Sequence, residues 1–373
     1  MASRRHWHLS VFSALVGAAL LAACGGGGSE PVATRVVSFG DSLSDLGSYS
    51  PATSLAGTGA APFFGGRFTT NTHTGYTAAS NSNTATIWVE WVASRVGVAI
   101  TPHEVGFLTT SVKCPAAANP ALAGSCTGYG QGGAMVTNPN GIGKSGGALT
   151  VPVVTQVANH LTRFTGFGAG DIVFVWAGSN DMLVQFSSVG QGLPPATAIA
   201  NMQAAANQLV ALVKDQVVAR GATRVAVLNV PDAAVSPAFR ALPASSKALL
   251  TQLSAEFNTT LATGLAGTDV RIVDIRAFIL DSVANPSKYG FTNATAATCD
   301  PAKIQAVTGG RVTDGSSLFC NASTQAFNTM KTGASASTWL FADGVHPTSG
   351  GHKAIGDYVI TQLKDYGWLP GNL

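Results

Sequence analysis

Short, fully apolar segments alternate with helix-like segments along most of this 373-residue chain, and this alternation constrains the fold more than any other feature. Apolar residues in the intervening segments recur near the 3.6-residue period of a helix. Strands that are apolar on both faces and separated by helices indicate a parallel sheet covered on both sides. The expected strands are 35–39, 171–176, 223–229 and 269–275, and the expected helices are 85–96, 151–164, 197–219, 246–263 and 350–364.

The segment from 36 to 373 is expected to form one domain, because no internal repeat and no second linker divides it. Two long irregular stretches, 103–148 and 281–338, are rich in Gly, Ala, Thr and Asn. Irregular stretches of this length inside a compact domain are usually functional. We therefore expect both stretches to have a function.

Polar residues follow the expected strands. Ser42 comes within three residues of the first strand, and Gly178-Ser179-Asn180-Asp181 follows strand 171–176. Asp343-Gly344-Val345-His346-Pro347 lies just before the last helix. In an open parallel sheet the ligand site lies beyond the carboxyl ends of the strands, so the sequence places these segments at one candidate site.

The pattern of Ser42, Asp343 and His346 predicts nucleophilic catalysis. A serine hydroxyl is a weak nucleophile that needs a base, and the base needs an orienting group. His346 is the candidate base, and Asp343, three residues earlier, can reach its other ring nitrogen. A triad depends on geometry and not on chain order. Oxyanion donors would come from Ser42 N–H, the Gly132-Gly133 turn and the Asn180 amide.

These residues lie in four blocks that resemble the signature blocks of the GDSL, or SGNH, hydrolase family. The blocks occur in the family's order and span most of the chain. Gly66-Arg-Phe-Thr-Thr-Asn71 followed by Trp88-Val-Glu90 is also similar to a stretch of the family's lipase and esterase branch. The four blocks are Gly-Asp-Ser-Leu-Ser-Asp (40–45), Gly-Gly-Ala (132–134), Gly-Ser-Asn-Asp (178–181) and Asp-Gly-Val-His-Pro (343–347).

The resemblance implies a flavodoxin-like α/β/α sandwich with a mostly parallel sheet. It implies ester hydrolysis through an acyl-enzyme, without a metal or cofactor, with Ser42 as nucleophile, His346 as base and Asp343 as its partner. Asn180 and a glycine of the second block would complete the oxyanion hole with Ser42. The second block departs from the family's usual Asn-aromatic-Ala-x-Gly-Gly, since Gly128-Tyr-Gly-Gln-Gly-Gly133 stands there. Gly132 and Gly133 both stay candidates for the glycine that donates to the oxyanion, and Gly133 is favoured.

Simpler interpretations stand beside these. Ser42 could be a plain helix N-cap, a common place for serine. Ser145 lies in a G-x-S-x-G pattern, but that motif requires a preceding strand, and 138–141 reads Asn-Pro-Asn-Gly. Asp45 and Asp181 are expected to hold turns, and His352 is expected at the start of the last helix, facing solvent or a loop.

The first 24 residues predict export. Arg4 and Arg5 precede an apolar run over 9–23, which is too short to span a bilayer comfortably but fits a signal peptide. Leu21-Ala22-Ala23-Cys24 resembles a bacterial lipobox. We therefore expect a lipoprotein signal peptide over 1–23, a lipidated Cys24 and a flexible tether over 24–35. The expected location is a bacterial membrane, in particular the outer membrane, with secretion after ordinary signal cleavage as the alternative.

Four cysteines remain if Cys24 is lipidated, and an even number in an oxidising compartment predicts disulfides. Local pairing of Cys114 with Cys126 and of Cys299 with Cys320 is favoured, because each pair lies within one irregular stretch and brackets a Gly- or Thr-rich segment of it. A zinc site is the rival interpretation. Their spacings differ from CxxC, and no histidines cluster nearby.

The charge balance argues against nucleic acid as a partner. Charged residues make up 10% of the chain, far below the roughly 25% of a typical domain. The net charge is +3, but without Arg4 and Arg5 the chain has 19 basic and 18 acidic residues. No basic run survives that count.

The expected substrate is an ester of an acyl lipid or a simple aliphatic acid, because the lipase-branch resemblance and the apolar stretch 60–68 favour it. An O-acetyl esterase acting on a polysaccharide is the runner-up. A different class of function is a surface-binding lipoprotein that uses the same scaffold without catalysis.

Overall fold

The computed structural model describes residues 33–55, 63–64, 66–72, 76–77, 80–81, 83–323 and 328–373, and all of them belong to one compact unit. The expected signal peptide, Cys24 and the tether as far as residue 32 lie outside these residues. Their roles therefore stay predictions.

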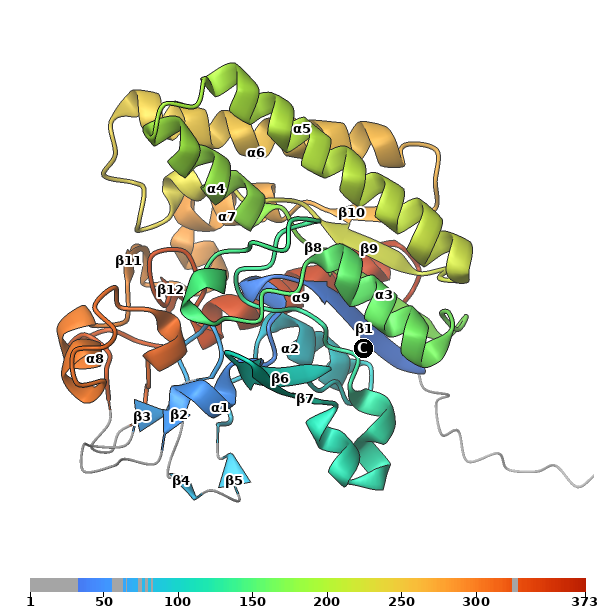
Figure 1. The fold of residues 1–373 in the computed structure, drawn as a ribbon, viewed down its shortest axis with the longest axis horizontal. Helices are drawn as coiled ribbons and strands as arrows, with labels where there is room; N and C mark the ends of the chain where they lie inside the picture. The colour runs from blue at the N-terminus through green and yellow to red at the C-terminus, as the bar shows by residue number, and fades with distance from the viewer. Residues whose placement is uncertain are drawn as a thin grey trace, which may run out of the picture. The chain divides into compact units, whose positions relative to one another are not determined.

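The core of the fold is a parallel sheet (Figure 1). In the described residues its strands follow the order β1-β8-β9-β10, with β1 Arg35–Gly40, β8 Asp171–Trp176, β9 Val225–Leu228 and β10 Arg271–Val273. Two-stranded ribbons lie outside this sheet. These are β2 Ser54–Leu55 with β3 Phe63–Phe64, β4 Tyr76–Thr77 with β5 Ser80–Asn81, β6 Glu104–Phe107 with β7 Thr110–Lys113, and β11 Asn293–Ala297 with β12 Trp339–Phe341.

The strands of the sheet alternate with α-helices, as the apolar pattern predicts. Within the described ranges, no helix is both long enough and apolar enough to cross a membrane. The helices are α1 Ser50–Thr53, α2 Trp88–Arg95, α3 Val153–Phe164, α4 Ser179–Gly190, α5 Pro195–Leu212, α6 Ala244–Leu265, α7 Ile275–Ala284, α8 Pro301–Val307 and α9 Ser349–Asp365.

A fifth segment extends the sheet beyond β1. Residues 127–131 run parallel to β1, with Ser38 N–H donating to Thr127 O (3.0 Å) and Tyr129 N–H donating to Ser38 O (2.8 Å). When the five segments are numbered by their order in the chain, they lie across the sheet in the order 2-1-3-4-5. This is the flavodoxin-like order, whose ligand crevice lies between the first and third strands. In this chain it lies beyond the carboxyl ends of β1 and β8, which pair in parallel along their length.

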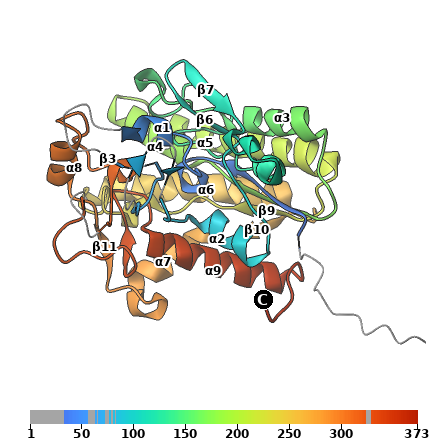
Figure 2. The ribbon, with the colours of Figure 1, turned by 90° about the horizontal axis from the view of Figure 1, so that it is seen from below.

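Helices cover both faces of the sheet, which confirms the predicted fold class. Val37 and Phe39 of β1 pack on one face with α3, α4, α5 and α6, and Figure 1 shows α5 and α6 together on that side. Val36 faces the other side, where α2, α7 and α9 pack; Figure 2 shows α7 beside α9. Successive strand residues face opposite layers, so a fully apolar strand is needed between two helical layers.

Two expected elements end earlier than predicted. The strand expected over 269–275 stops at Val273, because Asp274 caps α7 by accepting a hydrogen bond from Ala277 N–H (2.9 Å). The helix expected over 197–219 is α-helical only to Leu212, and short π and 3₁₀ turns follow it. Gly221 ends these turns with φ +101°.

Each irregular stretch contains one disulfide. Cys114 bonds to Cys126 with 5.4 Å between their Cα atoms, and Cys299 bonds to Cys320 with 5.7 Å. These are the local pairings that the spacing favours. The second stretch contains α8 and contributes to the site described next.

Candidate active site

Ser42 lies in a tight turn at the carboxyl end of β1. Asp41 is the N-cap of the 3₁₀ turn Ser42–Ser44, because its side chain accepts a hydrogen bond from Leu43 N–H (3.0 Å). Ser42 is therefore the first residue of the turn and not its cap. Its hydroxyl is available for another partner, which the plain N-cap interpretation would not provide.

That partner is the imidazole of His346. The His346 Nε2 atom lies 2.8 Å from Ser42 Oγ, across 304 residues of sequence. The His346 Nδ1 atom lies 2.8 Å from Asp343 Oδ2 and 2.9 Å from Asp343 Oδ1. Val345 N–H and His346 N–H also donate to Asp343 Oδ1, at 2.9 and 2.8 Å. The structure thus brings together the three residues that the sequence proposes for a triad.

The electrostatics of the pair fit a base whose protonated form is stabilised by a carboxylate. Burial disfavours the imidazolium, but the charge and hydrogen bond of Asp343 outweigh it and raise the pKa of His346. Burial would raise the pKa of Asp343, but the His346 charge and the hydrogen bonds from His346 and Ser317 hold it below its usual range. Asp343 therefore stays ionised and stabilises a proton on His346.

Backbone geometry distinguishes the two glycines of the second block. Gly132 N–H donates to Asp45 Oδ2 (2.8 Å), so that donor is engaged. In the part of the chain that the structure describes, Ser42 N–H and Gly133 N–H have no hydrogen-bond partner. Gly133 has φ +80°, and a Cβ there would lie 1.9 Å from Ile142 O, so only glycine fits. Ser42 and Gly133 line the same cavity, and Gly133 is the better oxyanion candidate.

Asn180 reaches this cavity from the first turn of α4. Its Nδ2 donates one hydrogen bond to Ala134 O (2.9 Å), and an amide nitrogen carries two hydrogens. Asp181, the next residue, accepts a hydrogen bond from Val136 N–H (3.1 Å), and burial raises the pKa of Asp181 to about 6. Both residues fix the start of α4 against the second block. Asn180 also lines the cavity with Ser42, which is compatible with its predicted role.

The cavity has a volume of about 710 Å³, within the usual range of ligand pockets. Ser42, Asn180 and His346 contribute polar atoms to its wall, and the rest of the lining is mostly apolar. The apolar lining comes from segments far apart in the sequence, among them Leu43, Phe107, Ile142, Met182, Leu318 and Phe319.

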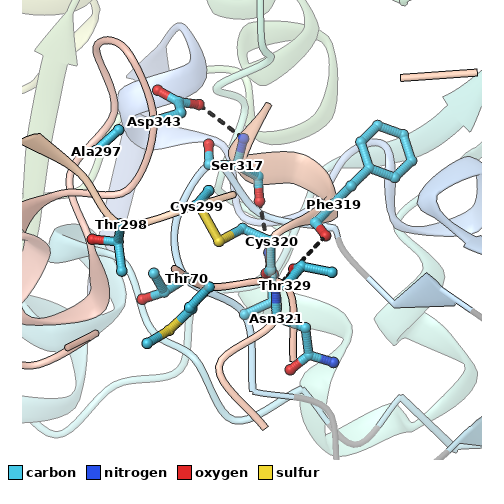
Figure 3. The surroundings of a disulfide bond; sticks show 12 residues. Thr70, Ala297, Thr298, Cys299, Ser317, Phe319, Cys320, Asn321, Thr329 and Asp343 are labelled. Atoms are coloured by element: carbon cyan, nitrogen blue, oxygen red, sulfur yellow. Dashed lines mark hydrogen bonds between the residues drawn. A yellow bond between two sulfur atoms is a disulfide. The ribbon is translucent and has the colours of Figure 1, made fainter. Parts of the chain in front are cut away.

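Two contacts to the triad were not predicted from the sequence. The Phe68 ring packs on His346, with 4.8 Å between the ring centroids. Ser317 N–H donates to Asp343 Oδ2 at 2.9 Å (Figure 3). Two features of the sequence could have pointed to these contacts, namely the similarity of 66–71 to the family and the length of the 281–338 stretch. Neither feature identifies which atom makes the contact.

The structure also places His352 and Ser145. His352 lies at the start of α9 as expected and faces the loop residue Phe68, but it is fully buried and does not face solvent. Its Nδ1 accepts a long hydrogen bond from Trp88 N–H and its Nε2 lies near Phe68 O, both at 3.4 Å; α9 packs against α2, which covers it. Ser145 lies in an exposed 3₁₀ turn, Lys144–Gly146, with no strand directly before it, so the G-x-S-x-G match has no structural support.

Comparison with known proteins identifies the family of this chain. A family model described as GDSL-like lipase/acylhydrolase matches residues 36–359. The GDSL esterase/lipase APG of Arabidopsis thaliana is 30% identical over 158 residues, which is 39% of this chain and 41% of that protein. Two further GDSL esterase/lipases of the same organism are 27% and 28% identical over 105 residues, or 28% of this chain and 24% of each relative. Each match spans less than half of the relative's length.

Proposed function

The chain belongs to the GDSL-like lipase/acylhydrolase family, and from this premise we propose that it is a serine hydrolase of carboxylic esters. The observation that supports this most directly is the 2.8 Å contact between Ser42 Oγ and His346 Nε2. Asp343 on the opposite ring nitrogen supplies the orienting group that such a pair needs. The relatives named esterase/lipase support the same class of reaction.

In the first step, Ser42 Oγ attacks the ester carbonyl while His346 Nε2 removes the hydroxyl proton. The bond from Oγ to the carbonyl carbon forms, and the carbonyl oxygen becomes an oxyanion. Ser42 N–H, Gly133 N–H and the free hydrogen of the Asn180 amide are the proposed donors to that oxyanion. Asp343 stabilises the imidazolium that results.

In the second step, the proton on His346 Nε2 passes to the oxygen of the leaving alcohol as the ester C–O bond breaks. The acyl group is then bonded to Ser42. A water molecule gives a proton to His346 and attacks the acyl carbon through the same oxyanion site. Protonation of Ser42 Oγ releases the carboxylic acid and restores the starting state.

Ser42→Ala is the direct test. It removes the nucleophile from a turn whose cap is Asp41, so the fold should persist while hydrolysis of a chromogenic short-chain ester falls by at least about 10³-fold. A fluorophosphonate probe should label the wild-type protein and leave the variant unlabelled, because only an activated serine reacts. Undiminished hydrolysis by Ser42→Ala rules out the mechanism. Failure of the wild-type protein to react favours the non-catalytic, surface-binding alternative.

We propose acyl lipids or simple aliphatic esters as the substrate class. The apolar wall of the 710 Å³ cavity suits a hydrocarbon chain better than a sugar. The alternative, removal of O-acetyl groups from a polysaccharide, would leave most of this cavity empty. Release of fatty acid from phospholipid, measured beside release of acetate from acetylated glycan, separates the two.

We also propose that the protein is lipid-anchored to a bacterial membrane at Cys24, as the Leu-Ala-Ala-Cys segment at 21–24 predicts. A single acyl chain gives only marginal membrane binding, so the multiply acylated cysteine of a lipoprotein is the expected anchor. Cys24→Ala should move the protein from the membrane fraction to the aqueous fraction. An unchanged distribution contradicts the anchor without affecting the proposed reaction.

A further inference from the structure

One backbone N–H from the 281–338 stretch reaches the candidate triad. Ser317 N–H donates to Asp343 Oδ2 at 2.9 Å, from 26 residues earlier in the chain (Figure 3). Val345 N–H and His346 N–H also contact this carboxylate, but they belong to its own turn. Among the described residues, Ser317 supplies the single donor to Asp343 from outside that turn.

A disulfide directly follows the turn that contains Ser317. The 3₁₀ turn Ser317–Phe319 runs directly into Cys320, which bonds to Cys299. Cys299 N–H donates to the carbonyl of Ala342 (2.8 Å), the residue immediately before Asp343. The disulfide therefore links the turn that donates to Asp343 with the backbone that leads into Asp343. Figure 3 shows this turn, the disulfide and the carboxylate together.

Asn71 is hydrogen-bonded to the same turn and to the cysteine that follows it. It is fully buried, and its N–H donates to Cys320 O at 2.9 Å. Its Nδ2 lies 3.0 Å from Ser317 O and 3.1 Å from Cys320 O. Phe68, three residues before Asn71, packs on the His346 ring. One segment thus contacts both the candidate base and the turn behind the carboxylate.

The turn also forms part of the substrate cavity. Leu318 and Phe319 line its wall, while Ser317 N–H of the same turn contacts Asp343. A displacement of this turn would therefore change the support of the carboxylate and the shape of the cavity together.

We propose that the turn Ser317–Phe319, fixed by the Cys299–Cys320 disulfide and by Asn71, is a positioning unit that orients Asp343 and forms the cavity wall beside it. Ser317 acts through Asp343 and His346 and does not contact the reacting atoms, so it is a positioning residue. The inference rests on the proposed ester hydrolysis. It assigns a role in the reaction to a segment outside all four motif blocks.

Ser317→Pro removes the donor, and its Cδ takes the place of the hydrogen that points at Asp343 Oδ2, so the carboxylate must also move away from the turn. Proline is favoured at the first position of a helical turn, and Ser316, with φ −50° and ψ 130°, already lies outside the α region that a following proline disfavours. Ser317→Ala is the matched comparison, because it keeps the N–H. It removes only a hydroxyl that has no hydrogen-bond partner within the described residues.

We expect Ser317→Pro to have a kcat roughly tenfold below that of Ser317→Ala, with a similar KM, since a hydrogen bond to a charged group is lost. The acid limb of its pH–rate profile should also move to lower pH, because a less constrained carboxylate supports the imidazolium less well. If the variant were only less stable, its smaller folded fraction would lower the rate at every pH without moving the midpoint of the pH–rate profile. Equal kcat values and equal midpoints for the two variants overturn the proposal.

A pair of disulfide variants keeps the test decisive if Ser317→Pro does not fold. The double variant Cys299→Ala with Cys320→Ala should have a lower kcat. Its activity is divided by the folded fraction, which circular dichroism measures. Cys114→Ala with Cys126→Ala removes a cross-link of similar kind, 12 residues apart instead of 21, and should leave kcat unchanged. Equal losses in the two pairs count against the proposal. Wild-type protein without esterase activity would instead contradict the proposed function, so the two failures are distinguishable.

Discussion

Asp41 is a buried acid directly beside the candidate nucleophile. Its Oδ1 accepts a hydrogen bond from Leu43 N–H, and within the described residues its Oδ2 has no hydrogen-bond partner. Burial raises the pKa of Asp41 to about 7, against the lowering effects of Leu43 N–H and of the His346 charge. The charge of Asp41 in turn helps to raise the pKa of His346, after the larger effects of burial and Asp343. Asp41 therefore has a structural role as a cap and an electrostatic role toward the base.

Asp41→Asn separates those two roles, because asparagine is an equally good N-cap but carries no charge. The reaction needs neutral His346, so activity falls as pH drops through the pKa of His346. Removing the negative charge lowers that pKa, and the acid limb of kcat/KM should move to lower pH in the variant. Parallel pH–rate profiles with one ester measure the shift. Coincident acid limbs would mean that Asp41 acts only as a cap.

At the scale of elements, the start of α4 depends on the backbone of Gly178. This residue is the N-cap of the helix and has φ +110°. A Cβ at this position would lie 2.5 Å from the Phe257 ring and 2.8 Å from Val230 Cγ2. The left-handed turn lets the chain pass from β8 to α4 within three residues, so that Asn180 reaches the cavity.

Gly178→Ala should lower the free energy of unfolding by about 1–3 kcal/mol, because it adds backbone strain and a clash at once. Gly190→Ala, at the other end of the same helix, is the matched control. A Cβ at Gly190 meets nothing within 4 Å, so that change should have an effect of at most about 1 kcal/mol, and in the stabilising direction. Urea denaturation of both variants measures the difference. Equal stabilities would show that the turn at Gly178 tolerates a side chain.

At the scale of the whole molecule, the cavity is formed by segments from both halves of the chain. Leu43 follows the first strand, Met182 lies in α4, and Leu318 belongs to the irregular stretch 281–338. If the proposed ester hydrolysis is correct, the size and apolar lining of this cavity should determine which acyl groups fit beside Ser42. Each methylene buried there contributes roughly 0.8 kcal/mol.

We expect kcat/KM for a series of p-nitrophenyl esters to rise roughly three- to fourfold per added methylene, until the chain fills the cavity, and then to level off. Leu318→Trp, which narrows the cavity wall, should move that break to shorter chains. A series that is highest at acetate and falls with every added carbon contradicts the acyl-lipid proposal and favours the O-acetyl alternative.

The sequence by itself determined the features that depend on local pattern. Apolar runs separated by amphipathic segments predicted the parallel sheet and its two helical layers, because burial on both faces requires such strands. Short motifs that follow two of those strands or precede the last helix made Ser42, Asn180, Asp343 and His346 the candidate site residues. Spacing alone favoured the two disulfide pairs.

Only the tertiary structure decided which atoms meet. It placed Ser42 Oγ beside His346 Nε2, occupied Gly132 N–H with Asp45 so that Gly133 stays available, and brought Ser317 N–H to Asp343. It also buried His352 beneath α2. Backbone N–H groups are the same at almost every residue, so no residue type marks the ones that matter. Their partners depend on packing between segments that are distant in sequence, and that packing exists only in the folded chain.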